Sequence, residues 1–179
     1  AVYLLSQGEL EDVKLSRDIN LDKDKYMDMI YKKTASLIEA ACGAAAVSAG
    51  FEKEPFMNYG KNIGIAFQII DDLLDVIQDE ETLGKPAMHD FFEGKTTLPF
   101  IYLFERASED EKEKLKSLYK KRLQEDEVLW IRELMGKYSI IKKCYNEAKE
   151  LVGKAKEEIK KFNMPQLEMI AQKVVEREF

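Results

Sequence analysis

The sequence predicts an all-α protein built as a helical bundle. Apolar residues recur at spacings of three and four over long stretches, which is the period of an α-helix. Few segments show the alternation of a β-strand, and only 9 glycines and 4 prolines interrupt the 179 residues. Because 45% of the residues are apolar and no low-complexity linker divides the chain, we expect one folded domain or one part of a domain.

The first part of the chain is expected to form two helices. The first spans about Val2 to Lys14 and is followed by a polar link that contains Asn20. A long helix then runs from about Lys23 to Gly50, where the glycine is a suitable C-terminal stop. The second half of this helix is rich in alanine and glycine, so another helix can approach it closely.

A further long helix is predicted from about Pro55 to Gln78, because proline is tolerated in a first helical turn. Its apolar face follows the helical period through Ile63, Ala66, Phe67, Ile70, Leu74 and Ile77. Residues 79–96 are expected to form an irregular loop, since Gly84, Pro86 and Gly94 interrupt them.

The remainder of the chain is also predicted to be helical. Helices are expected to resume near Leu98, near Glu109, near Glu125 and over Ile140 to Phe162. Asn163 is expected to cap a last helix that begins at Pro165 and ends near Phe179. Charges of both signs recur at helical spacing after residue 109, which indicates a solvated outer face.

The composition excludes several classes of protein. A formal net charge of −6 argues against a general nucleic-acid binder, and no run approaches the roughly 20 apolar residues of a membrane-spanning helix. Cys42 and Cys144 are the only cysteines and His89 is the only histidine. These counts exclude a disulfide framework, a Cys/His zinc site and any Ser-His mechanism that does not use His89. We expect a reducing, cytoplasmic location and a non-catalytic loop position for His89.

A cluster of acidic residues is the most informative feature. Asp71, Asp72 and Asp75 fall within one strongly apolar helical segment, where aspartate is an unfavourable residue. Asp71 and Asp75 lie one turn apart, with Asp72 beside them. Mutual repulsion destabilises three adjacent anions unless a cation offsets it, so a divalent cation with oxygen ligands is the simplest explanation. The alternative is an exposed acidic face, which the surrounding isoleucine and leucine residues disfavour.

Polar residues extend this cluster in both directions. A stripe on one side of the predicted helix, which would face a cavity in a bundle, contains Lys61, Gly64, Gln68, Asp71 and Asp75. Two Gly-Lys pairs then follow the acids and supply Lys85 and Lys95. Carboxylates that hold Mg²⁺, together with lysines, form the composition that binds a diphosphate. On its own, a Gly-Lys pair is more typical of an exposed loop.

The order of these motifs is specific. It comprises Gly64, Phe67-Gln68-Ile69-Ile70-Asp71-Asp72-Leu73-Leu74-Asp75, Leu83-Gly84-Lys85-Pro86, Asp90 and Gly94-Lys95-Thr96-Thr97-Leu98-Pro99. In order, spacing and residue type, this run closely resembles the second aspartate-rich motif and lysine loop of the trans-prenyltransferases, the polyprenyl synthetase family. Earlier in the chain, Gly8-Glu9 and Lys33-Thr34 are similar to two further pairs in that family. The shared pattern runs from about Tyr3 to Arg106.

The resemblance implies a fold and a reaction. The fold is the all-α isoprenoid synthase bundle, in which two aspartate-rich motifs face each other across a cavity. The reaction is head-to-tail condensation of isopentenyl diphosphate with an allylic diphosphate, which gives a polyprenyl diphosphate. Carried over to this sequence, the ligands of Mg²⁺ would be Asp71, Asp72 and Asp75. The metal would hold the allylic diphosphate.

The same resemblance implies roles for other polar residues. Neutralisation of the diphosphate oxygens would fall to Lys33, Lys85 and Lys95. Thr34 and Gln68 would contribute hydrogen bonds near the reacting carbon, so Lys33, Thr34, Gln68 and Lys85 form the expected catalytic set. Asp12 stands where many members have glutamine, and no role is carried over to it.

The chain also departs from the family pattern. It contains one D-D-x-x-D motif, whereas family members carry two and are usually much longer. We therefore expect residues 1–179 to be the C-terminal portion of a single polyprenyl synthetase domain that is inactive without the missing N-terminal half. Two alternatives remain: a non-catalytic subunit of this fold that needs a partner chain, and a helical interaction module. The resemblance further implies a homodimer and peripheral membrane contact through a greasy product, whose length stays open from farnesyl to octaprenyl-type.

Overall fold

The computed structural model describes residues 1–78 and 87–176, and the regular elements within these ranges are all helices. In chain order they are α1 (Val2–Leu15), α2 (Lys23–Ile30), η1 (Tyr31–Ala35), α3 (Ser36–Ser48), α4 (Lys53–Ile77), α6 (His89–Phe92), α7 (Leu98–Arg106), α8 (Glu109–Leu118), α9 (Glu125–Lys137), α10 (Ile140–Ile159), η2 (Lys160–Phe162) and α11 (Pro165–Val175). The predicted all-α bundle is confirmed.

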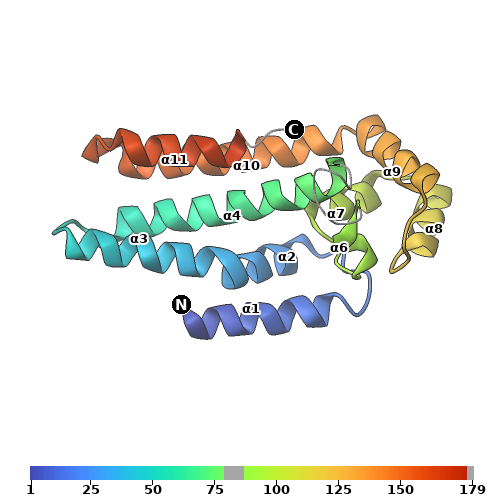
Figure 1. Ribbon diagram of the computed structural model, residues 1–179, viewed down its shortest axis with the longest axis horizontal. Coiled ribbons are helices and arrows are strands. Elements are labelled where there is room, and N and C mark those ends of the chain that lie inside the picture. Colours follow the sequence, from blue (N-terminus) through green and yellow to red (C-terminus); the bar gives the residue numbers. More distant parts are fainter. Residues whose placement is uncertain (79–86, 177–179) are drawn as a thin grey trace.

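Helix α4 is the element around which the bundle is built. Figure 1 shows α4 between α3 on one side and α10 with α11 on the other, and α4 makes its most extensive contacts with α3 and α10. Its buried apolar residues include Ile63, Ala66, Ile69, Ile70, Leu73 and Val76. Burial of apolar surface contributes about 25 cal/mol per Å², so a helix covered on opposite sides is strongly held in place.

The predicted continuous helix over residues 23–50 is interrupted by a π-helical turn, η1. One extra residue in a turn changes the direction of the side chains that follow, and such turns are common at functional sites. The hydroxyl of Ser36 donates to the carbonyl of Lys32 at 2.8 Å and so satisfies one backbone acceptor within the turn. Lys33 and Thr34 both lie in η1, which aims them toward different neighbours. The predicted stop is present, since Gly50 follows α3 with a φ of 79°.

Two predicted helix boundaries need correction. Helix α4 begins at Lys53 rather than Pro55, and the proline occupies the first turn. Asn163 does not cap the last helix, because it adopts a left-handed conformation with a φ of 50° and terminates η2. Met164 is the N-cap of α11, and Pro165 begins that helix as predicted.

The C-terminal end of α4 is fixed by a cation from α9. The guanidinium of Arg132 donates to the carbonyl of Val76 at 2.9 Å and to that of Gln78 at 2.7 Å. A positive charge at this end also interacts favourably with the negative end of the helix dipole. The last turn of α4, which carries Asp75, is therefore tied to a neighbouring helix.

None of the helices described combines the length and apolar character needed to cross a bilayer. Gly84, Lys85 and Pro86 lie outside the described residues.

Candidate functional site

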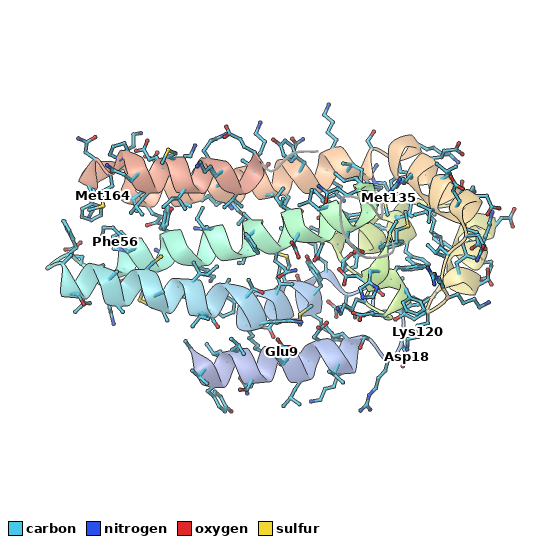
Figure 2. The ribbon with its side chains drawn as sticks, viewed as in Figure 1. Glu9, Asp18, Phe56, Lys120, Met135 and Met164 are labelled. Atoms are coloured by element: carbon cyan, nitrogen blue, oxygen red, sulfur yellow. The ribbon has the colours of Figure 1, made fainter. Side chains whose placement is uncertain are left out.

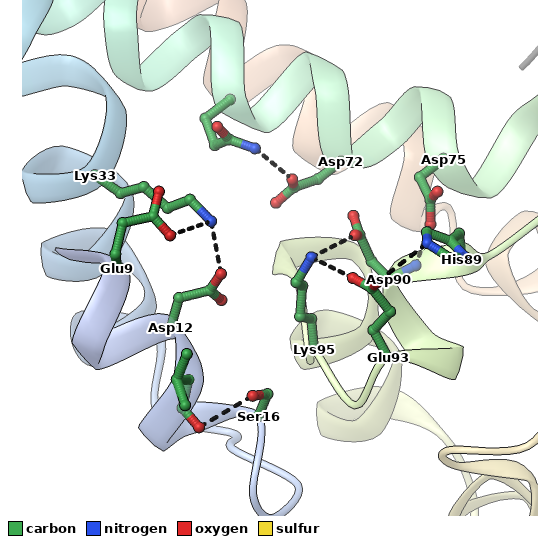
Figure 3. A network of polar contacts seen from close by, with 12 residues as sticks. Glu9, Asp12, Ser16, Lys33, Asp72, Asp75, His89, Asp90, Glu93 and Lys95 are labelled. Atoms are coloured by element: carbon green, nitrogen blue, oxygen red, sulfur yellow. Dashed lines mark hydrogen bonds and ion pairs between the residues drawn. The ribbon is translucent and has the colours of Figure 1, made fainter. Parts of the chain in front are cut away.

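A polar cavity of about 250 Å³ lies between α1, α2 with η1, α4 and the segment that leads into α7. Charged side chains from all of these elements converge on it, as Figure 3 shows. Its charged lining residues are Asp12, Lys33, Asp71, Asp72, Asp90 and Lys95. A cavity with acids and lysines close together suits an anion that is bound together with cations.

Asp72 is the buried centre of a hydrogen-bond chain. Its carboxylate accepts from the hydroxyl of Tyr26 at 2.6 Å and from Nε2 of Gln68 at 2.9 Å. The hydroxyl of Thr34 donates to Oε1 of Gln68 at 2.9 Å, which extends the chain to η1. Three elements therefore fix the position of a carboxylate that is only 3% exposed.

The surroundings of Asp72 disfavour its charged form. Burial raises the pKa of Asp72 to about 8, and the neighbouring carboxylates of Asp90 and Asp71 act in the same direction. The hydrogen bonds from Tyr26 and Gln68 oppose this increase without cancelling it. A cation placed in the cavity would stabilise the carboxylate, so the site is electrostatically suited to bind one.

The other two acids of the motif have different surroundings. Asp71 is exposed and lines the cavity. Asp75 is buried under α6, where one of its oxygens accepts from the backbone N–H of Asp90 at 3.1 Å. Asp71 and Asp75 lie one turn apart on α4, but α6 packs over Asp75 and leaves Asp71 exposed. Assignment of Asp75 as a metal ligand stays a prediction.

The carboxylates at the cavity fit a hard divalent cation whose remaining ligands come from a bound anion and water. Across residues 1–78 and 87–176, no three acidic, histidine or cysteine side chains form a metal site by themselves. Asp71, Asp72 and Asp90 nevertheless present carboxylate oxygens to one cavity. Mg²⁺ typically takes one or two carboxylates and completes its shell with water and phosphate oxygens.

Lys33 is held at the cavity by acids from α1. Its ammonium lies 2.6 Å from Oδ2 of Asp12 and 3.3 Å from Oε2 of Glu9. Burial alone would lower the pKa of Lys33, but the hydrogen bond and charge of Asp12, with those of Glu9, raise it. Lys33 is therefore protonated at neutral pH and can pair with an anion.

Lys95 approaches the cavity from the segment before α7. Its ammonium lies 2.6 Å from Oε2 of Glu93 and 3.2 Å from Oδ1 of Asp90. Burial again opposes the charge, while Glu93 and Asp90 raise the pKa of Lys95 well above its usual value. The structure thus brings Lys33 and Lys95 to the same cavity from segments about sixty residues apart in sequence.

Gly8 sets the distance between α1 and Lys33. A Cβ at this position would lie 2.3 Å from the backbone nitrogen of Lys33, so only glycine permits the contact. We expect Gly8→Ala to lower the free energy of unfolding by about 1–3 kcal/mol, measured by urea denaturation. Gly153→Ala is the matched control, because open space surrounds Gly153 on α10 and alanine should stabilise the helix by about 0.5–1 kcal/mol. Equal effects of the two changes would contradict this account.

Parts of the predicted polar stripe are not in the cavity. The ammonium of Lys61 lies 5.1 Å from the ring centroid of Tyr31, and Gly64 packs against Ala35. Of the predicted stripe, Gln68 and Asp71 line the cavity, whereas Asp75 does not. Lys61 and Gly64 instead contribute to the close contact between α4 and the helices before it.

The structure also adds residues that the sequence reasoning did not assign. Tyr26, Asp12 and Asp90 line the cavity, and Tyr26 precedes Lys33 by two helical turns, a spacing that could have revealed it. His89, expected in a loop, is instead the first residue of α6, with Nε2 at 3.2 Å from Oε1 of Glu93. It is absent from the cavity lining.

The fold and the cavity together define a helical protein with a polar cavity lined by carboxylates and lysines. The sequence model of the family described as polyprenyl synthetase matches residues 1–135. The chain therefore belongs to the polyprenyl synthetase family.

Individual relatives agree with this assignment. The chain is 38% identical to a short chain isoprenyl diphosphate synthase of Methanothermobacter thermautotrophicus, over 97% of this chain and 55% of the relative. The crystal structure of octaprenyl pyrophosphate synthase from Helicobacter pylori superposes with a TM-score of 0.92 and 41% identity, over 98% of this chain and 57% of that chain. A polyprenyl synthase from Caulobacter crescentus, crystallised with calcium and isoprenyl diphosphate, gives a TM-score of 0.89 and 34% identity, over 99% and 56% of the two chains. The chain thus spans about half the length of these relatives.

Proposed function

We propose that this chain supplies the allylic-diphosphate side of a prenyltransferase active site. The complete site would condense isopentenyl diphosphate with an allylic diphosphate and release inorganic diphosphate. The single observation that carries the proposal is the cavity in which Lys33 and Lys95 flank the carboxylates of Asp71 and Asp72. Membership of the polyprenyl synthetase family and the diphosphate synthase relatives support it. An interaction module has no need of such a cavity and is not favoured.

Mg²⁺ would be held by Asp71 and Asp72, with Asp75 as a further ligand by family resemblance. When bound, it supplies charge stabilisation at the diphosphate leaving group as the allylic C–O bond breaks. The calcium and isoprenyl diphosphate in the Caulobacter relative support a cation-assisted diphosphate site. Lys33 and Lys95 would bind the diphosphate oxygens, and Lys85 would add a third ammonium by resemblance.

Gln68 and Thr34 would act as a polar pair beside the reacting carbon. Gln68 donates to Asp72 and accepts from Thr34, so its amide orientation is fixed at both ends. A fixed amide dipole can stabilise positive charge that develops on the allylic fragment without reorganising during the reaction. The side chain of Gln68 would thereby lie between Asp72, the carboxylate proposed to bind the metal, and the organic part of the substrate.

The proposal includes a second part of the active site. Because the chain spans about half of its relatives' length, we propose that residues 1–179 are the C-terminal portion of one synthetase domain. The remaining portion would provide the isopentenyl diphosphate site, and the chain alone would not turn over. A homodimer, a cytoplasmic location and contact of the product with a membrane complete the proposal, on the strength of the family resemblance.

Isothermal titration calorimetry with Mg²⁺ and farnesyl thiolodiphosphate, a non-hydrolysable allylic analogue, tests the function. We expect binding that requires Mg²⁺ and is lost with excess EDTA. If the chain needs its complement, the N-terminal half of a relative added in trans should restore binding. No Mg²⁺-dependent binding under either condition would refute the proposal.

A further inference from the structure

Two segments outside the long helices contribute to the lining of the cavity. Ser16 and Asn20 come from the link between α1 and α2, and Lys95, Thr96 and Thr97 come from the segment between α6 and α7. The turn that ends α8, residues 119–120, contacts both segments. In Figure 2, Lys120 lies next to Asp18 of the first link at this end of the molecule.

Tyr119 holds the segment that carries Lys95. Its hydroxyl donates to the carbonyl of Gly94, the residue directly before that lysine. Its ring packs edge-on against Phe91, with centroids 5.4 Å apart, and Phe91 stacks on Phe100 at 4.2 Å. Both phenylalanines are fully buried. The Tyr119 hydroxyl is therefore fixed relative to the core, and it fixes Gly94 in turn.

Lys120 connects the same turn to the other segment. Its ammonium donates to the carbonyl of Arg17 at 2.7 Å, and its backbone N–H donates to the carbonyl of Phe91 at 3.4 Å. The residue adopts a φ of 60°, a conformation that non-glycine residues rarely take. Through its bond to Arg17, the side chain joins the end of α8 to the link between α1 and α2.

Gly94 is the point at which the three segments meet. Its φ is 88°, and a Cβ there would lie 2.8 Å from the carbonyl oxygen of Ser16 and 2.4 Å from Cε of Lys120. The absence of a side chain lets the link after α1, the Lys95 segment and the end of α8 close on one another. Lys95 follows this junction directly, and its amide is further held by the carbonyl of Asp90 at 2.8 Å.

We propose that Tyr119 and Lys120 are positioning residues for the diphosphate site, acting as a clasp that holds Lys95 at the cavity. The proposal rests on the proposed function, because it takes a diphosphate as the anion that Lys95 binds. Neither residue lines the cavity, so neither touches the ligand. They act through the carbonyls of Gly94 and Arg17.

The direct test is Tyr119→Phe, which removes the hydroxyl and keeps the ring on Phe91. With Mg²⁺ and inorganic pyrophosphate as the probe, calorimetry should show affinity weakened by about 2- to 10-fold, the range of one net hydrogen bond. Lys120→Met should give a loss at the lower end of this range, because its bond is exposed. Tyr138→Phe is the matched control. The hydroxyl of Tyr138 donates to Glu111 at a distance of 2.7 Å, and neither residue lines the cavity. The pyrophosphate affinity of this variant should equal that of the unmodified protein.

A double-mutant cycle separates positioning from general damage. In a Lys95→Met background, Tyr119→Phe should cause no further loss of pyrophosphate affinity, because the lysine it positions is gone. An unchanged affinity in Tyr119→Phe, or a full additional loss in the Lys95→Met background, would overturn the clasp. Failure of the unmodified protein to bind pyrophosphate, both alone and with the N-terminal half of a relative added, would instead refute the proposed function.

Hydrogen exchange tests the clasp independently of binding. In Tyr119→Phe, the amide of Lys95 should exchange about 2- to 10-fold faster, while amides in the centre of α4 keep their rates. Unaltered exchange at Lys95 would overturn the proposal whatever the calorimetry shows.

Discussion

Replacing Asp71 with alanine is expected to weaken Mg²⁺-dependent pyrophosphate binding by about 100-fold, or about 3 kcal/mol. Asp71 is the exposed carboxylate of the motif at the cavity, so it can reach a cation without reorganisation of the core. Asp72 is buried and held by Tyr26 and Gln68, and it cannot move to replace the lost ligand. Titration calorimetry at saturating Mg²⁺ measures the change.

The control for this experiment is Glu133→Ala. Glu133 is an exposed acid within α9 and does not line the cavity, so its removal should leave the affinity unchanged. Both changes remove one exposed negative charge from a helix, which matches them for net charge. If Asp71→Ala binds within about twofold of the control, the motif is an ordinary acidic face, and the metal site is refuted.

The fold was largely predictable because apolar periodicity determines which helix faces are buried. The period through Ile63, Ala66 and Ile70 predicted α4, and these residues are indeed buried in the structure. The π-helical turn η1 could not be predicted, since one additional residue barely disturbs a helical pattern. The left-handed conformation of Asn163 was also missed, because asparagine is equally suited to cap a helix or to end one.

The candidate site was predictable where it depended on spacing along one helix. Gln68 and Asp71, which the spacing predicted to share one side of the helix, both line the cavity. Contacts between distant segments gave no such signal. The bond from Tyr26 to Asp72 joins residues 46 positions apart, and the bond from Lys33 to Asp12 joins residues 21 positions apart. Both depend on how the helices pack.

The burial of Asp72 links the site to the stability of the whole chain. This carboxylate, which we propose binds a cation, is kept between helices and away from water, where its ionised form is unfavourable. In the absence of the cation, folding has to accommodate a proton on this group or an uncompensated charge. The site is therefore expected to reduce stability in the metal-free protein, as strained functional sites commonly do.

Asp72→Asn is expected to stabilise the metal-free protein by about 4 kcal/mol at pH 7, which corresponds to a Tm increase of about 8–16 °C. In the folded chain the pKa of Asp72 is raised from 3.8 to about 8, chiefly by burial. Between these values the unfolded chain has released this proton while the folded chain retains it, so stability falls as pH rises from about 4 to about 8 and then levels off. Asparagine carries no charge and removes that contribution. The Tm difference between the two proteins should therefore be near zero at pH 4 and largest at pH 8, measured by thermal unfolding in EDTA.

Addition of Mg²⁺ and pyrophosphate should reverse the order of stability. The unmodified protein gains stability from binding, whereas Asp72→Asn has lost a carboxylate ligand and should gain little. Glu133→Gln serves as the control, because an exposed carboxyl should leave the pH profile of Tm parallel to that of the unmodified protein. A constant difference between Asp72→Asn and the unmodified protein from pH 4 to pH 8 would show that Asp72 titrates normally, and it would remove the electrostatic argument for a cation at this carboxylate.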